Sequence, residues 1–480
     1  MTSSVSCPET FAILGEKLEA LLGNRGLLRD EESLAPYLLE SRGRWRGWVP
    51  YMALPKSTEE VAETIKLCRA AGVAIVPQGG NTSRVGGALA RKEDGAILLN
   101  LARMNKIIEV DPLDYSMTLE GGAVLQSVQE AADSVDRLFP LSLGAEGSCQ
   151  IGGNLATNAG GIQVLRYGNA RDLVLGLEVV LADGKVWNGL NSLRKNNVGY
   201  DMKQIFLGSE GTLGIITKAV LKLFPKPKES VSLFIGLSKL EAACEFLAMA
   251  QGVTGGQVVG CELIPRLALD FTLKHIPGVK DPLEAPHDWY LLMRATAGRE
   301  NSGLQEAMES MLAEAFEAGL VSDAAIASSG AQDQALWRIR EALVEAQPKE
   351  GASIKHDISV PVSKVPEFIT RANTLVEKLV PGIRPYPFGH LGDGNIHYNL
   401  TQPLAMEPEA FFSRQTEIQK EVHDIALSLG GSISAEHGIG IVKKTELARV
   451  KDPLEIDLMR KIKKALDPEG LFNPGKIFDM

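Results

Sequence analysis

Apolar residues at helical spacing alternate with short apolar runs through the first half of the chain. Ser57 and Glu60 form a capping box before a predicted helix that Gly72 ends, and residues 73–76 follow as a short buried strand. Further strands are predicted at the apolar runs 96–100, 107–110, 116–120, 173–181 and 186–187. This mixture of helices and strands predicts an α+β fold.

The pattern changes at residues 225–228, where two prolines favour an extended linker. Predicted strands at 231–237 and 290–294 then alternate with predicted helices at 241–250 and 305–318, as in a sheet covered by helices. The chain closes with a helix that Asp452 caps. Its apolar stripe, which we expect to be buried, consists of Leu458, Met459, Ile462, Ala465 and Leu466. A chain of 480 residues is too long for one core, so two or three domains are expected.

Three loops rich in glycine interrupt the first region, at residues 77–87, 143–161 and 208–214. In the first loop, the glycines let consecutive backbone N–H groups point at one spot, as in loops that bind phosphate oxygens. The second loop lets the backbone pass close to a large flat ligand, although a tightly wound structural loop is the alternative. It offers hydrogen-bonding groups from Ser148, Asn154, Thr157 and Asn158. The chain has no Walker or Rossmann fingerprint, so neither of those nucleotide sites is predicted.

Two polar loops carry histidine in the second region. His390 and His397 flank Asp393-Gly394-Asn395, whose turn chemistry predicts a hairpin with the two imidazoles brought together. A third ligand is available in the loop 434–438, which contains Glu436 and His437. Such a set suits a metal or a substrate, whereas two ordinary turns with hydrogen-bonded histidines are the alternative.

Composition narrows the class of protein. The net charge of −10 argues against a nucleic-acid or anionic-membrane surface, and it means that an anionic substrate needs local basic residues. The five cysteines, Cys7 among them, form no C-x-x-C pair, which argues against a disulfide framework and for a reducing compartment. No stretch has the length of a membrane span or the pattern of a signal peptide, so a cytoplasmic location is expected.

The glycine loops, the histidine loops and Asn473-Pro474-Gly475-Lys476, in this order, resemble the flavin-dependent D-2-hydroxyacid dehydrogenases of the vanillyl-alcohol-oxidase type. The resemblance implies a two-part FAD-binding domain at residues 1–225 and a substrate-binding domain of antiparallel sheet and helices at 226–426. A C-terminal helical segment, 427–480, would return to the flavin, which would lie between the domains. An electron-transfer flavoprotein or a quinone would accept the electrons, and a homodimer is compatible with the family.

The resemblance also assigns residues. The FAD contacts that it implies are Pro77, Gly79, Gly80, Asn81, Thr82, Gly144, Ser148, Gly153, Asn154, Thr157, Asn158, Gly161, Gly211, Ile215 and Asn473. It implies ligands for Zn²⁺ or a similar divalent metal at His390, His397 and Glu436. FAD is expected to be non-covalent, because histidine is absent from residues 1–274 and only Cys149 and Tyr167 near the second glycine loop suit covalent attachment.

Substrate contacts implied by the resemblance are Arg340, Lys355, Asn399 and His437, with His437 as the general base. Two departures from the family pattern bear on the identity of the acid. Ser83-Arg84 in the first glycine loop stands where the family usually has glycine followed by an apolar residue, and Val344 replaces a threonine that contacts the substrate in close relatives.

The predicted substrate is a short D-2-hydroxyacid with a second carboxylate, (R)-2-hydroxyglutarate or D-malate. Arg340 is expected at the edge of a helical apolar stripe, where its guanidinium would bind a carboxylate. Lys355 is expected on a strand face shared with Asp357, where a surface ion pair is the alternative role. Oxidation of D-lactate or glycolate is the alternative within the family. A zinc hydrolase, with Glu436 or His437 activating a metal-bound water, is the alternative from another class.

Overall fold

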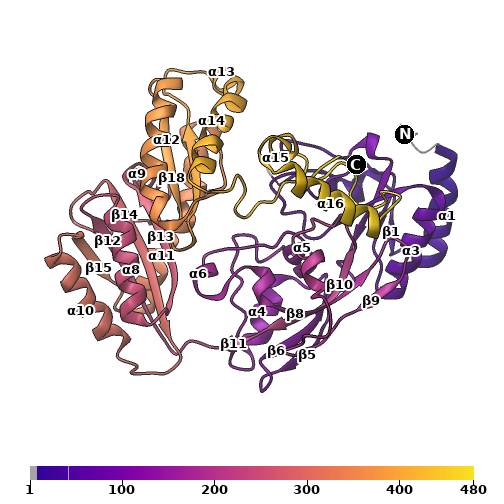
Figure 1. Cartoon of the computed structure of the whole chain (residues 1–480), viewed down its shortest axis with the longest axis horizontal. Coiled ribbons are helices and arrows are strands. Elements are labelled where there is room, and N and C mark those ends of the chain that lie inside the picture. Colours follow the sequence, from indigo (N-terminus) through magenta and orange to yellow (C-terminus); the bar gives the residue numbers. More distant parts are fainter. Residues whose placement is uncertain (1–7, 42, 480) are drawn as a thin grey trace. The chain divides into compact units, whose positions relative to one another are not determined.

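The computed structural model describes residues 8–41 and 43–479 (Figure 1). Cys7 therefore lies outside the described residues. The chain divides into two compact units. Unit 1 combines residues 1–160, 169–225 and 436–480, and unit 2 combines residues 161–168 and 226–435.

Unit 1 contains a sheet of strand order β1-β2-β4-β3 and an antiparallel sheet of order β5-β6-β10-β8-β9. The strands are β1 (Leu27–Leu28), β2 (Met52–Ala53), β3 (Ala74–Gln78), β4 (Ala96–Asn100), β5 (Ile107–Asp111), β6 (Ser116–Glu120), β7 (Arg137–Leu138), β8 (Val174–Val180), β9 (Val186–Asn188), β10 (Ile215–Lys222) and β11 (Phe224–Pro225). The α-helices are α1 (Pro8–Leu22), α2 (Glu31–Leu38), α3 (Thr58–Ala71), α4 (Leu125–Asp133), α5 (Ile151–Ala156), α7 (Lys203–Phe206), α15 (Lys444–Val450) and α16 (Pro453–Leu466).

The capping pattern around α3 is confirmed. The Ser57 side chain accepts a hydrogen bond from the Glu60 backbone N–H, and Gly72 ends the helix in the left-handed conformation, with φ 63°. The Glu60 carboxylate reaches back to the backbone N–H of Lys56 instead of that of Ser57. Helix α3 buries Val61, Ile65 and Cys68 against the first sheet, which orients β3 so that the first glycine loop follows directly from its end.

The prediction that residues 143–161 form one continuous loop was wrong, because residues 151–156 form the short helix α5. Its two glycines allow close packing on a neighbouring strand end. A Cβ on Gly152 would lie 3.0 Å from the backbone oxygen of Gly121. Glycine therefore allows the helix to pack closely on the end of a strand here, in addition to making loops flexible. Helix propensity alone does not distinguish these two uses of glycine.

The C-terminal segment of the chain belongs to unit 1. Residues Leu471 and Asn473 exchange backbone hydrogen bonds with Ile75 of β3 at 2.8 Å each, so the tail lies alongside that strand. The predicted buried stripe of α16 was wrong: Leu458 and Ile462 are 50% and 41% exposed. The buried face instead carries Ile456 and Lys463, whose ammonium donates to the Thr212 carbonyl (2.7 Å), the Phe472 carbonyl (3.0 Å) and the carboxylate of Asp467.

Unit 2 contains a sheet of strand order β15-β12-β14-β13-β18-β19-β16, with β17 also paired to β19. The strands are β12 (Glu229–Leu237), β13 (Val258–Pro265), β14 (Trp289–Ala297), β15 (Val321–Ile326), β16 (Ser353–Ile354), β17 (Ile358–Ser359), β18 (Arg384–His390) and β19 (Asn395–Thr401). The α-helices are α6 (Val164–Tyr167), α8 (Ala242–Thr254), α9 (Arg266–His275), α10 (Leu304–Glu317), α11 (Gly330–Ala346), α12 (Val365–Leu379), α13 (Pro408–Ser413) and α14 (Gln415–Ser428).

All the strand pairs of this sheet are antiparallel, and apolar clusters lie on both of its faces. One cluster packs α8, α10, α12 and α14 against the strands, and the other packs α9 and α11. Strand β13 is consequently buried along its whole length. None of the helices in the described part of the chain combines the length and apolar character that a membrane crossing requires.

Candidate functional site

The glycine loops of unit 1 meet around the end of β3. A Cβ on Gly80 would lie 1.9 Å from the Ser148 backbone oxygen, so the first and second loops touch through their main chains. A Cβ on Gly211 would lie 2.8 Å from the Pro77 ring, which brings the third loop to the same place. We call the residues of these two contacts, with Gln78, Gln150, Asn154 and Asn473, the glycine cradle.

Polar groups of the glycine cradle lack partners. The buried side-chain amide oxygens of Gln78, Gln150, Asn154 and Asn473 accept no hydrogen bond from any described residue. The amide nitrogen of Asn473 donates to the Gly87 and Glu210 carbonyls at 3.0 and 2.7 Å, which ties the C-terminal segment to the first and third loops. Buried oxygens without donors are costly unless a ligand or water supplies them, so the cradle is suited to a ligand rich in donors and acceptors.

The other predicted FAD contacts lie in different settings. Thr157 donates to the Gly153 carbonyl at 3.0 Å, and Asn158 accepts from the Arg171 backbone N–H at 3.0 Å, so both side chains already support the second loop. Ile215 is buried in the apolar core of unit 1. Gly161 begins the short segment that belongs to unit 2. Asn81 and Thr82 lie at partly exposed positions of the first loop, and Gly144 is exposed in the second.

The predicted histidine hairpin is confirmed. Strands β18 and β19 pair in antiparallel register, with His390 opposite Asn395 and Phe388 opposite His397. The turn closes through Gly394, whose φ of 78° is left-handed and disfavours a side chain. The two imidazole rings lie 5.5 Å apart between centroids at a near-perpendicular angle of 76°. A rigid hairpin in a buried sheet therefore positions both imidazoles.

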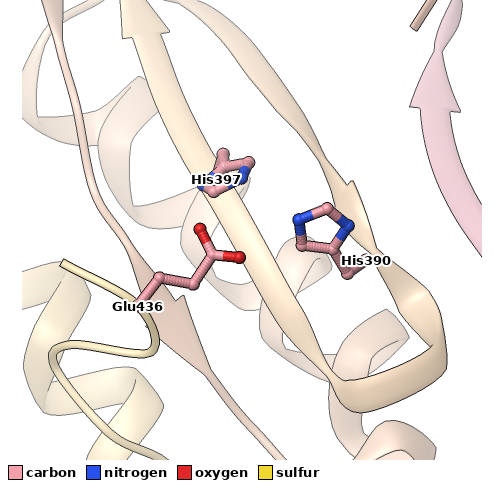
Figure 2. A group of neighbouring side chains, drawn as sticks. All are labelled: His390, His397 and Glu436. Carbon is pink, nitrogen blue, oxygen red and sulfur yellow. The ribbon is translucent and has the colours of Figure 1, made fainter. Parts of the chain in front are cut away.

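Glu436 completes a donor set with this pair. It follows Ala435, whose backbone N–H donates to the Asp357 carbonyl at 3.2 Å, so chain connectivity brings the carboxylate to the hairpin. One ligand atom from each of His390, His397 and Glu436 lies within 4.8 Å of the others, and Figure 2 shows the carboxylate turned toward the imidazoles. Asp357, Glu436 and His437 form a second such group that shares Glu436. Two nitrogens and one oxygen suit zinc or a similar divalent ion with a coordination position left for substrate.

A fully buried carboxylate stands behind His390. Glu262 of β13 is 0% exposed, and its Oε1 lies 2.5 Å from His390 Nδ1 while its Oε2 accepts from Arg340 Nε at 2.5 Å. Burial raises the pKa of Glu262, but the Arg340 charge and then His390 outweigh it and hold that pKa well below the usual range. The carboxylate is thus ionised and shared between a predicted metal ligand and a predicted substrate contact.

The predicted substrate residues have different burial. Arg340 lies on the buried face of α11, with its guanidinium carbon 4.8 Å from the centre of the Phe388 ring. Asn399 is buried and donates to Gln347 Oε1 at 3.0 Å. Lys355 is half-buried between β16 and β17 instead of within a strand. Val344 is 42% exposed, and Arg84 is exposed in unit 1.

Two acidic residues escaped the sequence analysis. Glu262 interrupts the apolar run of β13, and a lone carboxylate in a continuously apolar strand is a usable signal, because an ion cannot stay there without partners. Glu210, in the third glycine loop, accepts hydrogen bonds from the backbone N–H groups of Ile439 and Gly440 at 2.7 and 2.8 Å, just after His437. Burial raises the pKa of Glu210 despite these two donors. The sequence contains no local pattern that would identify that contact.

Comparison with known proteins identifies the class. Residues 49–189 match the FAD binding domain family, and residues 226–477 match the FAD linked oxidases, C-terminal domain. The chain is 37% identical to the mitochondrial D-2-hydroxyglutarate dehydrogenase of Arabidopsis thaliana, over 95% of this chain and 80% of that protein. It is 39% identical to the D-2-hydroxyglutarate dehydrogenase of Xanthomonas citri pv. viticola, over 92% and 93% of the two chains. The fold is similar to that of p-cresol methylhydroxylase, with a TM-score of 0.77, 16% identity and 98% of each chain covered.

These matches and the glycine cradle define a flavoprotein oxidoreductase with the predicted α+β fold of the vanillyl-alcohol-oxidase type. The chain belongs to the FAD-linked oxidases and, among them, to the FAD-dependent D-2-hydroxyacid dehydrogenases. The cradle fits FAD, because it combines loop contacts at Gly80 and Gly211 that are too close for a Cβ with four buried amide oxygens that need donors. Because the chain belongs to this family of dehydrogenases, the alternative prediction of a zinc hydrolase was wrong.

Proposed function

We propose that this dehydrogenase oxidises (R)-2-hydroxyglutarate, with D-malate as the second candidate, to the 2-oxoacid. The observation that carries the proposal is the histidine hairpin, where a metal donor set and the buried cation Arg340 are joined through one carboxylate. Such an arrangement suits a substrate that offers an α-hydroxyacid group to a metal and a carboxylate to a guanidinium. The names of the two relatives described above support the same acid.

We also propose a separate role for each of three segments of the chain. Residues 1–225 would bind FAD, residues 226–426 would bind the substrate, and residues 427–480 would return to the flavin. The hydrogen bonds of Asn473 to the first and third glycine loops support the last assignment. FAD, when bound, supplies the two-electron acceptor for the hydride from C2 of the substrate.

His390, His397 and Glu436 would hold a divalent metal, zinc or a similar ion. When bound, that ion supplies Lewis acidity, which favours loss of the proton from the substrate hydroxyl. His437 would accept this proton as the general base, and its place directly after Glu436 supports the role. The three ligands and the base come from two short stretches of chain, so little ordering is required when substrate binds.

Arg340, Lys355 and Asn399 would bind the substrate carboxylates. Glu262 engages Arg340 through Nε, the donor nearest the side-chain stem, so its terminal amino groups are the ones suited to fork a substrate carboxylate. Val344 offers no hydroxyl for the distal carboxylate, and its exposure beside buried Arg340 supports a change in acid preference at this turn of α11. Arg84 remains a candidate cation for the distal carboxylate.

We also propose how FAD is attached, what reoxidises it, and where and in which oligomeric state the enzyme acts. FAD would be held without a covalent link, which is supported by the burial of Cys149 and by the raised pKa that burial gives its thiol. An electron-transfer flavoprotein or a quinone would reoxidise the flavin, and the enzyme would act in the cytoplasm, as a homodimer. The described cysteines are all free thiols, in keeping with a reducing compartment.

A panel of D-2-hydroxyacids with an artificial electron acceptor tests the substrate. We expect 2-hydroxyglutarate or malate to exceed D-lactate and glycolate in kcat/KM. Arg340→Lys should raise the KM for the dicarboxylate about tenfold, because an ammonium cannot replace a guanidinium fork. Arg338→Lys is the matched control, since Arg338 lies on the same helix, is 43% exposed and pairs with Glu345. Preference for a monocarboxylate, with no effect of Arg340→Lys, would show that the dicarboxylate assignment is wrong while leaving the flavin chemistry intact.

A further inference from the structure

Glu262 lies at the centre of a hydrogen-bonded relay within unit 2. It stands opposite His390 across the β13–β18 pair, so the two side chains share one face of the sheet. Its Oε1 lies 2.5 Å from His390 Nδ1, and its Oε2 accepts a hydrogen bond from Arg340 Nε, also at 2.5 Å. The Arg340 guanidinium also lies over the Phe388 ring, and that ring lies 5.2 Å from the His397 imidazole.

The contact with His390 has a consequence for metal binding. A neutral imidazole carries one N–H, and a carboxylate at Nδ1 favours the tautomer with the proton on that nitrogen. Nε2 then carries the lone pair that a metal requires, and the negative charge behind Nδ1 makes that lone pair more basic. The ring orientation is restricted at the same time, because rotation would break a buried charge-assisted hydrogen bond.

The contact with Arg340 has a parallel consequence. A guanidinium buried on the inner face of α11 needs a counter-charge, and Glu262 supplies it while binding only the Nε position. Phe388 limits the tilt of the guanidinium plane from the other side. The direction of the terminal amino groups is therefore determined by the same carboxylate that orients His390.

We propose that Glu262 is a positioning residue that sets the metal-binding tautomer of His390 and the direction of Arg340 together. The inference rests on the proposed function, since it assumes a metal at His390 and a substrate carboxylate at Arg340. It adds that the two subsites are coupled, so that a disturbance of Glu262 weakens both while leaving the glycine cradle unchanged.

The test is Glu262→Gln in the full-length, FAD-loaded protein, with Zn²⁺ affinity measured by competition against a chelator of known affinity. Glutamine keeps the volume, but it carries no charge and offers one acceptor to two donors. We expect Zn²⁺ affinity to fall by about 10- to 100-fold, with FAD stoichiometry unchanged. At saturating Zn²⁺, the KM for 2-hydroxyglutarate should still be raised, on the order of tenfold, through the Arg340 contact.

Glu350→Gln is the matched control. Glu350 is a partly buried carboxylate of unit 2 that binds a histidine and an arginine, His275 at 2.6 Å and Arg384 at 2.9 Å, together with Lys274 at 2.6 Å. None of these residues belongs to the donor set. A purely structural role for Glu262 predicts that both variants lose thermal stability and that both bind Zn²⁺ as the wild type does. That result would overturn the inference.

Two further outcomes separate the inference from the proposed function. Wild-type protein that takes up no metal would contradict the proposed metal site, and the inference with it. Metal uptake by the wild type that is lost in His390→Ala but unchanged in Glu262→Gln would contradict the inference alone. If Glu262→Gln does not fold, Glu262→Asp replaces it. The shorter side chain keeps the charge but cannot hold both 2.5 Å contacts, so a smaller loss of Zn²⁺ affinity is expected, and none would overturn the proposal.

Discussion

The glycine cradle of unit 1 depends mainly on backbone contacts, whereas the histidine hairpin of unit 2 depends on contacts between side chains. The cradle is mainly backbone: Gly80 and Gly211 bring three loops together at distances that no side chain tolerates, and buried amide oxygens remain without donors. At the hairpin, the contacts are between side chains. His390 and Arg340 of α11 are buried, and each contacts the buried carboxylate of Glu262 of β13 at 2.5 Å.

The difference indicates what each region lacks without its ligand. Buried oxygens without donors are costly until a ligand or water supplies hydrogen bonds, so FAD is expected to contribute to the stability of unit 1. The hairpin already has paired charges, so it is organised before a metal binds. The two regions should therefore respond independently to removal of their ligands.

Metal removal should produce the largest effect. Dialysis against EDTA is expected to abolish turnover, by on the order of 10³ or more, since Lewis-acid assistance is worth several kcal/mol of the barrier. The visible flavin absorption should remain unchanged, because none of the donor residues belongs to the glycine cradle. Addition of Zn²⁺ should restore activity. Full activity in metal-free protein would show that the donor set is structural.

His437→Ala should have the next largest effect. Loss of a positioned general base costs about 10² to 10⁴ in rate, and both FAD and metal should stay bound. Measuring the Zn²⁺ content of the same sample distinguishes a general base from a residue that only orients Glu436. If metal is lost together with activity, His437 orients Glu436 instead of accepting a proton, and the base must be sought elsewhere.

Gly80→Ala tests the backbone character of the cradle. The new Cβ would collide with the Ser148 oxygen, a main-chain atom that cannot rotate away. Such overpacking typically costs about 1–3 kcal/mol, so we expect FAD affinity to fall by about 10- to 100-fold while Zn²⁺ affinity is unchanged. Gly298→Ala is the control, because a Cβ there meets no atom within 4 Å. Equal FAD binding in both variants would contradict the cradle.

Local chemistry was sufficient to predict much of the hairpin. Turn residues around Gly394 and the alternation that follows them are short-range signals, so the approach of His390 and His397 could be predicted from the sequence. The order of the glycine loops likewise led to the correct family. The helix α5 could not be found in this way, because glycine serves both loops and close-packed helices.

The burial and pairing of Arg340, Lys463 and Glu262 depend on partners that are distant in sequence, so they could not be predicted. The pairing of Arg340 with Glu262 was not predicted, and Lys463 was not expected in the buried face of α16, because basic side chains are usually solvated. Glu262 is 78 positions from Arg340 in sequence, and the contact of Lys463 with Thr212 spans 251 positions. Pairing over such separations changes which face of a helix is buried, and helical periodicity carries no information about it.

The smallest predicted effect concerns the apolar face of α16 in unit 1. Leu458 is 50% exposed, whereas Ile456 on the other face is 8% exposed and packs with Leu447 and Ile477. Leu458→Ser should change the free energy of unfolding by no more than about 0.5 kcal/mol and the thermal midpoint by no more than about 2 °C. Ile456→Ser should cost about 2 kcal/mol or more, because it places a hydroxyl in an apolar cluster. Equal losses in the two variants would contradict the exposure of Leu458 in solution. They would indicate that this face is covered there, as it would be if α16 formed the interface of the proposed homodimer.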